Sequence, residues 1–123
     1  MKSIKILDKN DEQKNIIKSV EYADTFTKRL IGLMGQKTFK GMLFKQKRTQ
    51  RIFSSIHTSF MKVPIDIIYI NKNMEVMEKT ILTPWKIHIP ENNNIKYILE
   101  LPEGHSKLYD IKLKDKIVIK DEQ

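Results

Sequence analysis

Two acidic residues lie within otherwise apolar segments, and they are the first candidates for chemistry. Asp66 lies in the apolar run of residues 64–70, and Glu100 lies between two leucines. Carboxylates are rarely buried without a partner, because removing their charge from water is costly. Two carboxylates that lie side by side can divide the roles of general acid and general base in a hydrolase. Alternatively, Asp66 holds backbone N–H groups of a crossing loop, and Glu100 points into solvent.

His57 is a third polar candidate, placed where a predicted strand ends. Together with Asp66 and Glu100 it offers a ligand set of the histidine and carboxylate type. Their spacing matches no standard zinc motif, and the chain has no cysteine. The chain also lacks the glycine motifs that bind phosphates or dinucleotides. We therefore expect no metal and no cofactor, and a hydrogen-bonded structural role for His57 is the alternative interpretation.

Apolar and basic side chains gathered around His57 are typical of a small-molecule pocket. Phe60, Met61 and Trp85 could form its apolar wall, and Arg29 and Lys62 could supply positive charge. In the alternative interpretation, Phe60 and Met61 belong to the core. The predicted ligand-binding residues are therefore Arg29, His57, Phe60, Met61, Lys62, Asp66 and Glu100.

The positive charge of the chain is concentrated in one interval. Lys and Arg number 23 against 15 Asp and Glu, a net charge of +8. Nine of these basic residues, and no acidic one, lie between Asp24 and Asp66, so the rest of the chain has 14 basic and 15 acidic residues. A concentrated positive field attracts anions. A small anionic ligand is one interpretation, nucleic-acid binding through residues 28–51 is another, and a solvated surface is the third.

The elements that would position these residues are mostly strands. Alternation of apolar and polar residues, or a short apolar run, predicts strands over residues 2–7, 15–21, 41–44, 51–57, 65–70, 74–82, 86–89, 96–101 and 116–120. The strand over residues 65–70 is apolar on both faces, which predicts a central position in the sheet. Asn71-Lys-Asn73 predicts a hairpin turn, because asparagine tolerates a left-handed backbone. Helical spacing of apolar residues predicts one helix over residues 23–34, and residues 105–110 could form a single helical turn.

Short strands with few helices indicate a mainly β, single-domain fold, either a β-sandwich or an open barrel, with one α-helix packed against it. The 123 residues, 40% of them hydrophobic, suffice for one domain over residues 1–123. No apolar run reaches the length of a membrane span, and the first residues do not resemble a secretory signal. We expect a cytoplasmic protein with no membrane contact. The sequence leaves its oligomeric state open.

Three blocks of sequence carry a resemblance to a known family. They are Ala23-Asp-Thr-Phe-Thr-Lys-Arg-Leu-Ile-Gly-Leu-Met34 with Gly41-Met-Leu-Phe44, then His57-Thr-Ser-Phe-Met-Lys-Val-Pro-Ile-Asp-Ile-Ile-Tyr-Ile70, then Tyr97-Ile-Leu-Glu-Leu-Pro-Glu-Gly104. Over roughly residues 20–120 the chain resembles the domain of unknown function 192, or uncharacterised ACR, family. Many members have Trp-Met where this chain has Phe60-Met61. The resemblance implies a compact, mostly β fold and no particular substrate, cofactor or reaction.

Our leading functional interpretation is a non-catalytic module that binds a small, anionic ligand near residues 57–66. A hydrolase that uses Asp66 and Glu100 is the first alternative. Nucleic-acid binding through residues 28–51 is the second.

Overall fold

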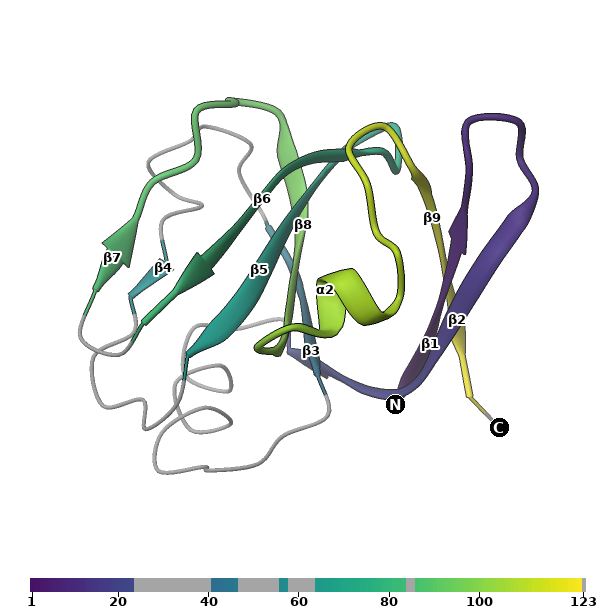
Figure 1. Cartoon of the computed structure of the whole chain (residues 1–123), viewed down its shortest axis with the longest axis horizontal. Coiled ribbons are helices and arrows are strands. Elements are labelled where there is room, and N and C mark those ends of the chain that lie inside the picture. The colour runs from purple at the N-terminus through teal and green to yellow at the C-terminus, as the bar shows by residue number, and fades with distance from the viewer. Residues whose placement is uncertain (24–40, 47–55, 58–63, 84–85, 123) are drawn as a thin grey trace.

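The structure of this protein is a computed structural model, and it describes residues 1–23, 41–46, 56–57, 64–83 and 86–122. These residues form nine strands and one short helix (Figure 1). The elements are β1 (Lys2–Leu7), β2 (Gln13–Ala23), β3 (Met42–Lys45), β4 (Ile56–His57), β5 (Ile65–Asn71), β6 (Val76–Leu82), β7 (Ile87–His88), β8 (Ile95–Pro102), α2 (His105–Leu108) and β9 (Lys116–Asp121).

Seven of these strands form one twisted sheet in the order β6-β5-β8-β3-β2-β1-β9. Neighbouring strands are antiparallel except for β2 and β3, which run parallel, so the sheet is mixed. The two short strands β4 and β7 pair with each other in a separate small sheet. The predicted strands are confirmed, although only residues 56–57 of the predicted strand 51–57 fall within the described part of the chain.

The large sheet curls until its two edge strands, β6 and β9, meet at one corner. Glu75 and Lys116 form a β-bridge there, the Val76 N–H donates to the Asp115 carbonyl at 2.9 Å, and the Ile117 N–H donates to the Met74 carbonyl at 2.8 Å. Figure 1 shows the turn between β5 and β6 reaching the start of β9. Beyond this corner no ladder joins β6 to β9 within the described residues. The result is an open barrel, which confirms the predicted mainly β, single-domain fold.

Apolar side chains fill both faces of the central strands. One core cluster occupies the inside of the curled sheet and comprises Ile4, Ile6, Ile17, Val20, Leu43, Ile68, Ile70, Val76, Leu99, Leu101, Ile111 and Ile117. A second cluster lies on the other face and comprises Met42, Phe44, Ile65, Ile67, Tyr69, Leu82, Ile95 and Ile98. Every residue of β5 is buried, because β5 lies between β6 and β8 and both of its faces are covered. Such a strand reads as a continuous apolar run, as predicted.

The hairpin between β5 and β6 forms at the predicted residues, but through a different mechanism. The side-chain Oδ1 of Asn71 accepts hydrogen bonds from the Asn73 and Glu75 N–H groups, both at 2.9 Å. The residue with the left-handed backbone is Met74, with φ of 63°, rather than an asparagine. The expectation about the left-handed residue was therefore wrong, because the Asn71 side chain organises the turn from its first position.

The two helical predictions have different outcomes. The single turn predicted over residues 105–110 is confirmed as α2, which contacts β5 and β8. The helix predicted over residues 23–34 falls almost entirely on residues 24–40, outside the described residues. None of the described helical residues forms a helix of the length and apolar character that crossing a membrane requires.

The first and last strands pair with each other, so the two ends of the chain lie together (Figure 1). Lys2 opposes Asp121 in this ladder, and their side chains form an ion pair. The Glu122 N–H also donates to the Met1 carbonyl at 3.1 Å. The hydrogen bond to Asp121 raises the pKa of Lys2, and Lys2 lowers the pKa of Asp121 in return.

Candidate ligand pocket beside β6 at the opening of the barrel

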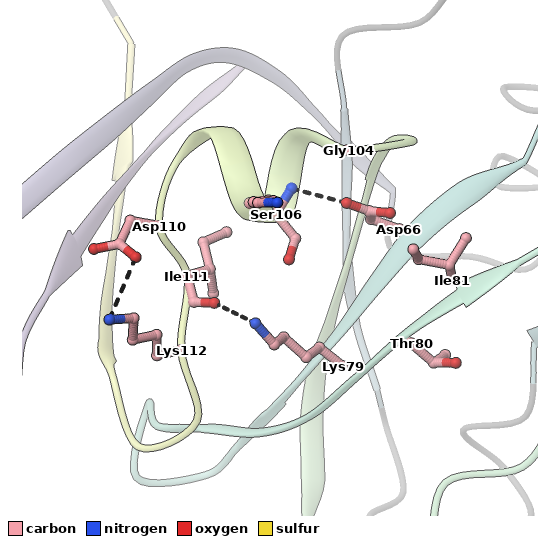
Figure 2. Close-up of a pocket in the computed structure, with 10 residues that line it drawn as sticks. Asp66, Lys79, Thr80, Ile81, Gly104, Ser106, Asp110, Ile111 and Lys112 are labelled. Atoms are coloured by element: carbon pink, nitrogen blue, oxygen red, sulfur yellow. Dashed lines mark hydrogen bonds and ion pairs between the residues drawn. The ribbon is translucent and has the colours of Figure 1, made fainter.

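A pocket of about 700 Å³ lies between β6 and the segment that contains α2 (Figure 2). Its lining consists of Asp66, Lys79, Thr80, Ile81, Gly104, Ser106, Lys107, Asp110, Ile111 and Lys112. Three of these side chains are basic and two are acidic, and Ile81 and Ile111 provide aliphatic surface. The volume is within the range that small-molecule sites occupy.

The pocket exists because the barrel is open beside β6. Ile81 opposes Asp66 and Lys79 opposes Ile68 in the ladder between β6 and β5, so all four side chains share the inner face of the sheet. Ile68 is fully buried, whereas Ile81 remains 59% exposed. The inner face is thus covered at Ile68 and accessible beside Ile81, away from the corner where β6 meets β9, and residues 104–112 border the space there.

Asp66 joins the start of β5 to α2. Its Oδ2 accepts a hydrogen bond from the Ser106 N–H at 2.8 Å. Gly104 occupies the N-cap position of α2 and has no side chain to cap the helix. Asp66 therefore supplies from another element the acceptor that an N-cap residue normally supplies. This geometry agrees with the structural role considered for Asp66.

The second carboxylate oxygen of Asp66 has no such partner. Asp66 is only 2% exposed, and its Oδ1 is buried without a hydrogen-bond donor among the described residues. Buried carboxylate oxygens are almost always hydrogen-bonded, since an unsatisfied one has lost its water. The unsatisfied acceptor therefore belongs to a residue that lines the pocket.

The pocket's lysines are held in different ways. The Lys79 ammonium donates to the Ile111 carbonyl at 2.7 Å, across the pocket from β6 to the opposite wall (Figure 2). Lys112 lies 3.6 Å from Asp110, and both side chains are largely exposed. An exposed pair of this kind contributes little to stability, so Lys112 is available to an incoming anion.

A partly buried ion pair fixes the far end of the pocket wall to β2. The Oδ2 of Asp115 accepts a hydrogen bond from the Lys14 ammonium at 2.7 Å and another from the Lys112 N–H at 2.8 Å. Asp110 adds a second carboxylate at 3.5 Å from Lys14. Burial lowers the pKa of Lys14, but the hydrogen bond to Asp115 and the charges of both carboxylates outweigh it and raise that pKa. The wall is therefore anchored by charge as well as by apolar packing.

The structure does not bring Asp66 and Glu100 together. In the ladder between β5 and β8, Asp66 opposes Leu101 and Glu100 opposes Ile67. Directly opposed residues share a face, and neighbours along a strand alternate. Leu101 belongs to the inner cluster and Ile67 to the outer one, so the two carboxylates point to opposite faces. The side-by-side pair that the hydrolase alternative requires is not formed. Glu100 is also fully buried rather than solvated.

The other predicted site residues either do not line the pocket or lie outside the described residues. His57 lies in β4, which pairs with β7, and its side chain is outside the described residues. Arg29, Phe60, Met61, Lys62 and Trp85 also lie outside the described residues. Of the two predicted ligand-binding residues whose side chains are described, Asp66 lines this pocket and Glu100 does not.

The other lining residues could not be predicted from the sequence, because they are distant from Asp66 along the chain. Lys79 and Ser106 stand in ordinary polar contexts, and only the curling of the sheet brings them beside Asp66. Within the described residues no three histidine or acidic side chains are gathered closely enough to hold a metal ion. The polar groups of the described pocket lining are lysines, carboxylates, the hydroxyls of Thr80 and Ser106, and backbone groups.

These observations define the class of protein as a mainly β open barrel with a pocket beside β6, where the barrel is open. Over residues 6–119 the chain matches the family DUF192, described as Uncharacterized ACR, and it belongs to that family. The UPF0127 protein of Pyrococcus furiosus is 36% identical over 104 residues, which cover 85% of this chain and 89% of that protein.

Two solved structures share the fold. A protein of unknown function from Novosphingobium aromaticivorans aligns with a TM-score of 0.77 and 18% identity, covering 94% of this chain and 83% of that chain. A Sinorhizobium meliloti protein, described as a candidate transcription regulator, aligns with a TM-score of 0.81 and 20% identity, covering 95% and 92%. At these identities the likeness establishes the fold alone.

Proposed function

We propose that this protein is a non-catalytic binding module for a small organic molecule with an anionic group, held in the pocket beside β6. The observation that supports the proposal is the pocket itself, with aliphatic surface from Ile81 and Ile111 and with lysines along its lining. Pockets that bind small molecules combine apolar walls with a few polar groups that fix orientation. The local excess of lysine favours an anion.

The geometry favours binding over hydrolysis. Asp66 already accepts a helix N–H, and its supposed partner Glu100 lies on the opposite face of the sheet. Among the described residues the pocket lining contains no histidine, and its one serine contacts Asp66 through the backbone N–H rather than through the hydroxyl. The other hydroxyl residue of the lining, Thr80, opposes Ile67 of the outer cluster, on the face of the sheet away from Asp66. A nucleophile aligned with a base, which hydrolysis by this route needs, is therefore absent from this described lining.

The nucleic-acid alternative receives no specific support. Of the nine basic residues between Asp24 and Asp66, only Lys45 lies within the described residues, where it is exposed at the end of β3. The description of the Sinorhizobium meliloti protein does not transfer at 20% identity. Binding through residues 28–51 stays a prediction from charge.

Fluorescence titration with anilinonaphthalene sulfonate tests the proposal, because this probe combines an apolar body with one anionic group. We expect saturable binding at one site. Ile81→Asp should weaken it by about tenfold or more, since it places a negative charge in the pocket wall. Ile87→Asp is the matched control, because Ile87 is a similarly exposed isoleucine, at 55%, on β7 and outside the lining. Absence of saturable binding, or equal loss in both variants, would contradict a binding site at this pocket.

A further inference from the structure

We infer that the ligand of this pocket is zwitterionic, with an ammonium or similar donor group at Asp66 and an anionic group at Lys79 and Lys112. The inference rests on the proposed function and specifies the chemical class of ligand. It follows from the polarity of the pocket, which has an acceptor without a donor at one end and lysines at the other.

The Asp66 carboxylate defines the end of the pocket that would bind the ligand's ammonium group. An ionised carboxylate has about four acceptor positions, and the Ser106 N–H occupies one of them. The Oδ1 atom is buried without a donor among the described residues, although Asp66 lines the pocket. The terminal torsion of aspartate is soft, so Oδ1 can turn toward the pocket. This rotation weakens the hydrogen bond from the Ser106 N–H to Oδ2, and the charge-assisted contact with the ligand must offset that loss. A ligand ammonium there would form a charge-assisted hydrogen bond to an oxygen for which the described residues supply no donor.

The anionic end is defined by Lys79 and Lys112. An ammonium group has three donors, and Lys79 uses one of them on the Ile111 carbonyl. Lys112 makes only a loose, exposed contact with Asp110. Both lysines can therefore bind a carboxylate without giving up a strong partner. Binding there would also displace little ordered structure, because neither Lys112 nor Asp110 is buried.

The two ends are separated along β6. Ile81 lies opposite Asp66 in the ladder, and Lys79 precedes Ile81 by two residues on β6. Two strand residues span roughly 7 Å. Figure 2 shows Asp66 near Ile81 at one side of the pocket and Lys112 near Asp110 at another. The charges of a matching ligand are therefore held apart by a short apolar body, as in an ω-amino acid.

Three related probes test this inference on the wild-type protein by NMR titration. Para-aminomethylbenzoate carries an ammonium and a carboxylate on opposite sides of a benzene ring. Para-methylbenzoate lacks the ammonium, and benzylamine lacks the carboxylate. We expect the zwitterion to bind about tenfold more tightly than either single-charge probe, the effect of one additional charge-assisted contact. A zwitterion that binds no better than para-methylbenzoate overturns the inference.

Asp66→Asn then tests whether the ammonium group of the ligand binds at Asp66. The variant keeps an acceptor for the Ser106 N–H but loses the charge, so the preference for para-aminomethylbenzoate over para-methylbenzoate should disappear. Glu78→Gln is the matched control, because Glu78 loses the same charge on the opposite face of β6, opposite Tyr69 and outside the lining. Glu78→Gln should prefer para-aminomethylbenzoate over para-methylbenzoate to the same extent as the wild type. An unchanged preference in Asp66→Asn would overturn the assignment of the ammonium to Asp66.

The outcomes separate this inference from the proposed function. If anilinonaphthalene sulfonate binds in an Ile81-dependent manner and the zwitterion shows no preference, the pocket binds anions and the zwitterionic class is wrong. If the sulfonate and all three small probes fail to bind, both proposals are wrong. Thermal melts of each variant, compared with wild type, distinguish lost binding from lost folding.

Discussion

Asp66 is a buried carboxylate whose Oδ2 accepts a hydrogen bond from the Ser106 N–H at 2.8 Å. An aspartate in an apolar run is recognisable as a buried carboxylate, because few other arrangements place it there. Its acceptor role at α2 involves a residue 40 positions later, a contact that depends on how β5 and α2 meet. Whether Asp66 and Glu100 share a face depends on the register of β5 against β8, and neither strand encodes that register alone.

Asp66→Ala should lower the free energy of unfolding by about 1–3 kcal/mol, because it leaves the partly buried Ser106 N–H without its acceptor. Asp66→Asn should cost less, since the amide oxygen can still accept that hydrogen bond. Urea unfolding of the two variants and the wild type measures the difference. Equal losses in both variants would show that the charge, rather than the acceptor, stabilises this position.

Lys14 provides a test of stability against pH. Its pKa is raised in the folded protein above the ordinary value of 10.5, where the hydrogen bond to Asp115 and two carboxylate charges outweigh burial. A raised folded pKa means that the stabilisation is fully present below the unfolded pKa and is lost as the pH rises through the folded pKa. The wild type should therefore lose more stability than Lys14→Met as the pH is raised above about 10.

Chemical unfolding of both proteins at a series of alkaline pH values measures this difference. The comparison removes the contributions of the other lysines, such as Lys2 and Lys116, whose pKa values are also raised by acidic partners. Parallel stability curves for wild type and Lys14→Met would show that the Lys14 pair does not carry the expected linkage.

At the scale of elements, period-two alternation located most of the strands, because each strand has an inner and an outer face to satisfy. The turn at residues 71–75 was also recognisable from its asparagines. The left-handed residue Met74 was not, because its backbone is set by two hydrogen bonds to Asn71 rather than by its own preference. The full extent of β2, to Ala23, follows from its parallel pairing with β3, which no local pattern reports.

Two glycines offer a matched comparison of backbone strain with and without crowding. Gly41 has φ of 146°, and a Cβ there would lie 3.1 Å from the Leu101 side chain. Gly104 has φ of 85°, and a Cβ there would meet nothing within 4 Å. Both alanine variants should be destabilised by about 1–3 kcal/mol from the backbone alone. Gly41→Ala should lose more, because Leu101 is buried in the inner cluster and must shift.

Thermal or urea unfolding of the two glycine variants checks this order. A larger loss for Gly104→Ala would show that the cap of α2, rather than the packing beside β3, is the more sensitive position.

At the scale of the whole molecule, the strand order could not be predicted. The central position of β5 was readable from its apolar faces, but the pairing of β1 with β9 joins residues from opposite ends of the chain. The contact of β6 with β9 at one corner likewise depends on the curvature of the complete sheet. The pocket is a consequence of that incomplete closure, so its lining was predictable only at Asp66, the one member buried in a recognisable strand.

The adjacent ends of β1 and β9 also determine how the molecule should respond to mechanical force. Pulling apart Met1 and Glu122 loads the ladder one rung at a time, beginning at the rung of Lys2 and Asp121, because both handles lie at the same end of two antiparallel strands. The strands should peel apart at low force. Pulling between Asn10, in the turn after β1, and Glu122 loads the same region along the strands, so several rungs must break together and the rupture force should be markedly higher.

Single-molecule force spectroscopy can make this comparison cleanly, because the chain has no cysteine and a pair of introduced cysteines gives unique attachment points. Equal rupture forces for the two pulling directions would mean that β9 is not the first strand to detach from the sheet under force. If the forces differ as expected, the protein is stiff or compliant according to the direction of the load, although its equilibrium stability is the same in both experiments.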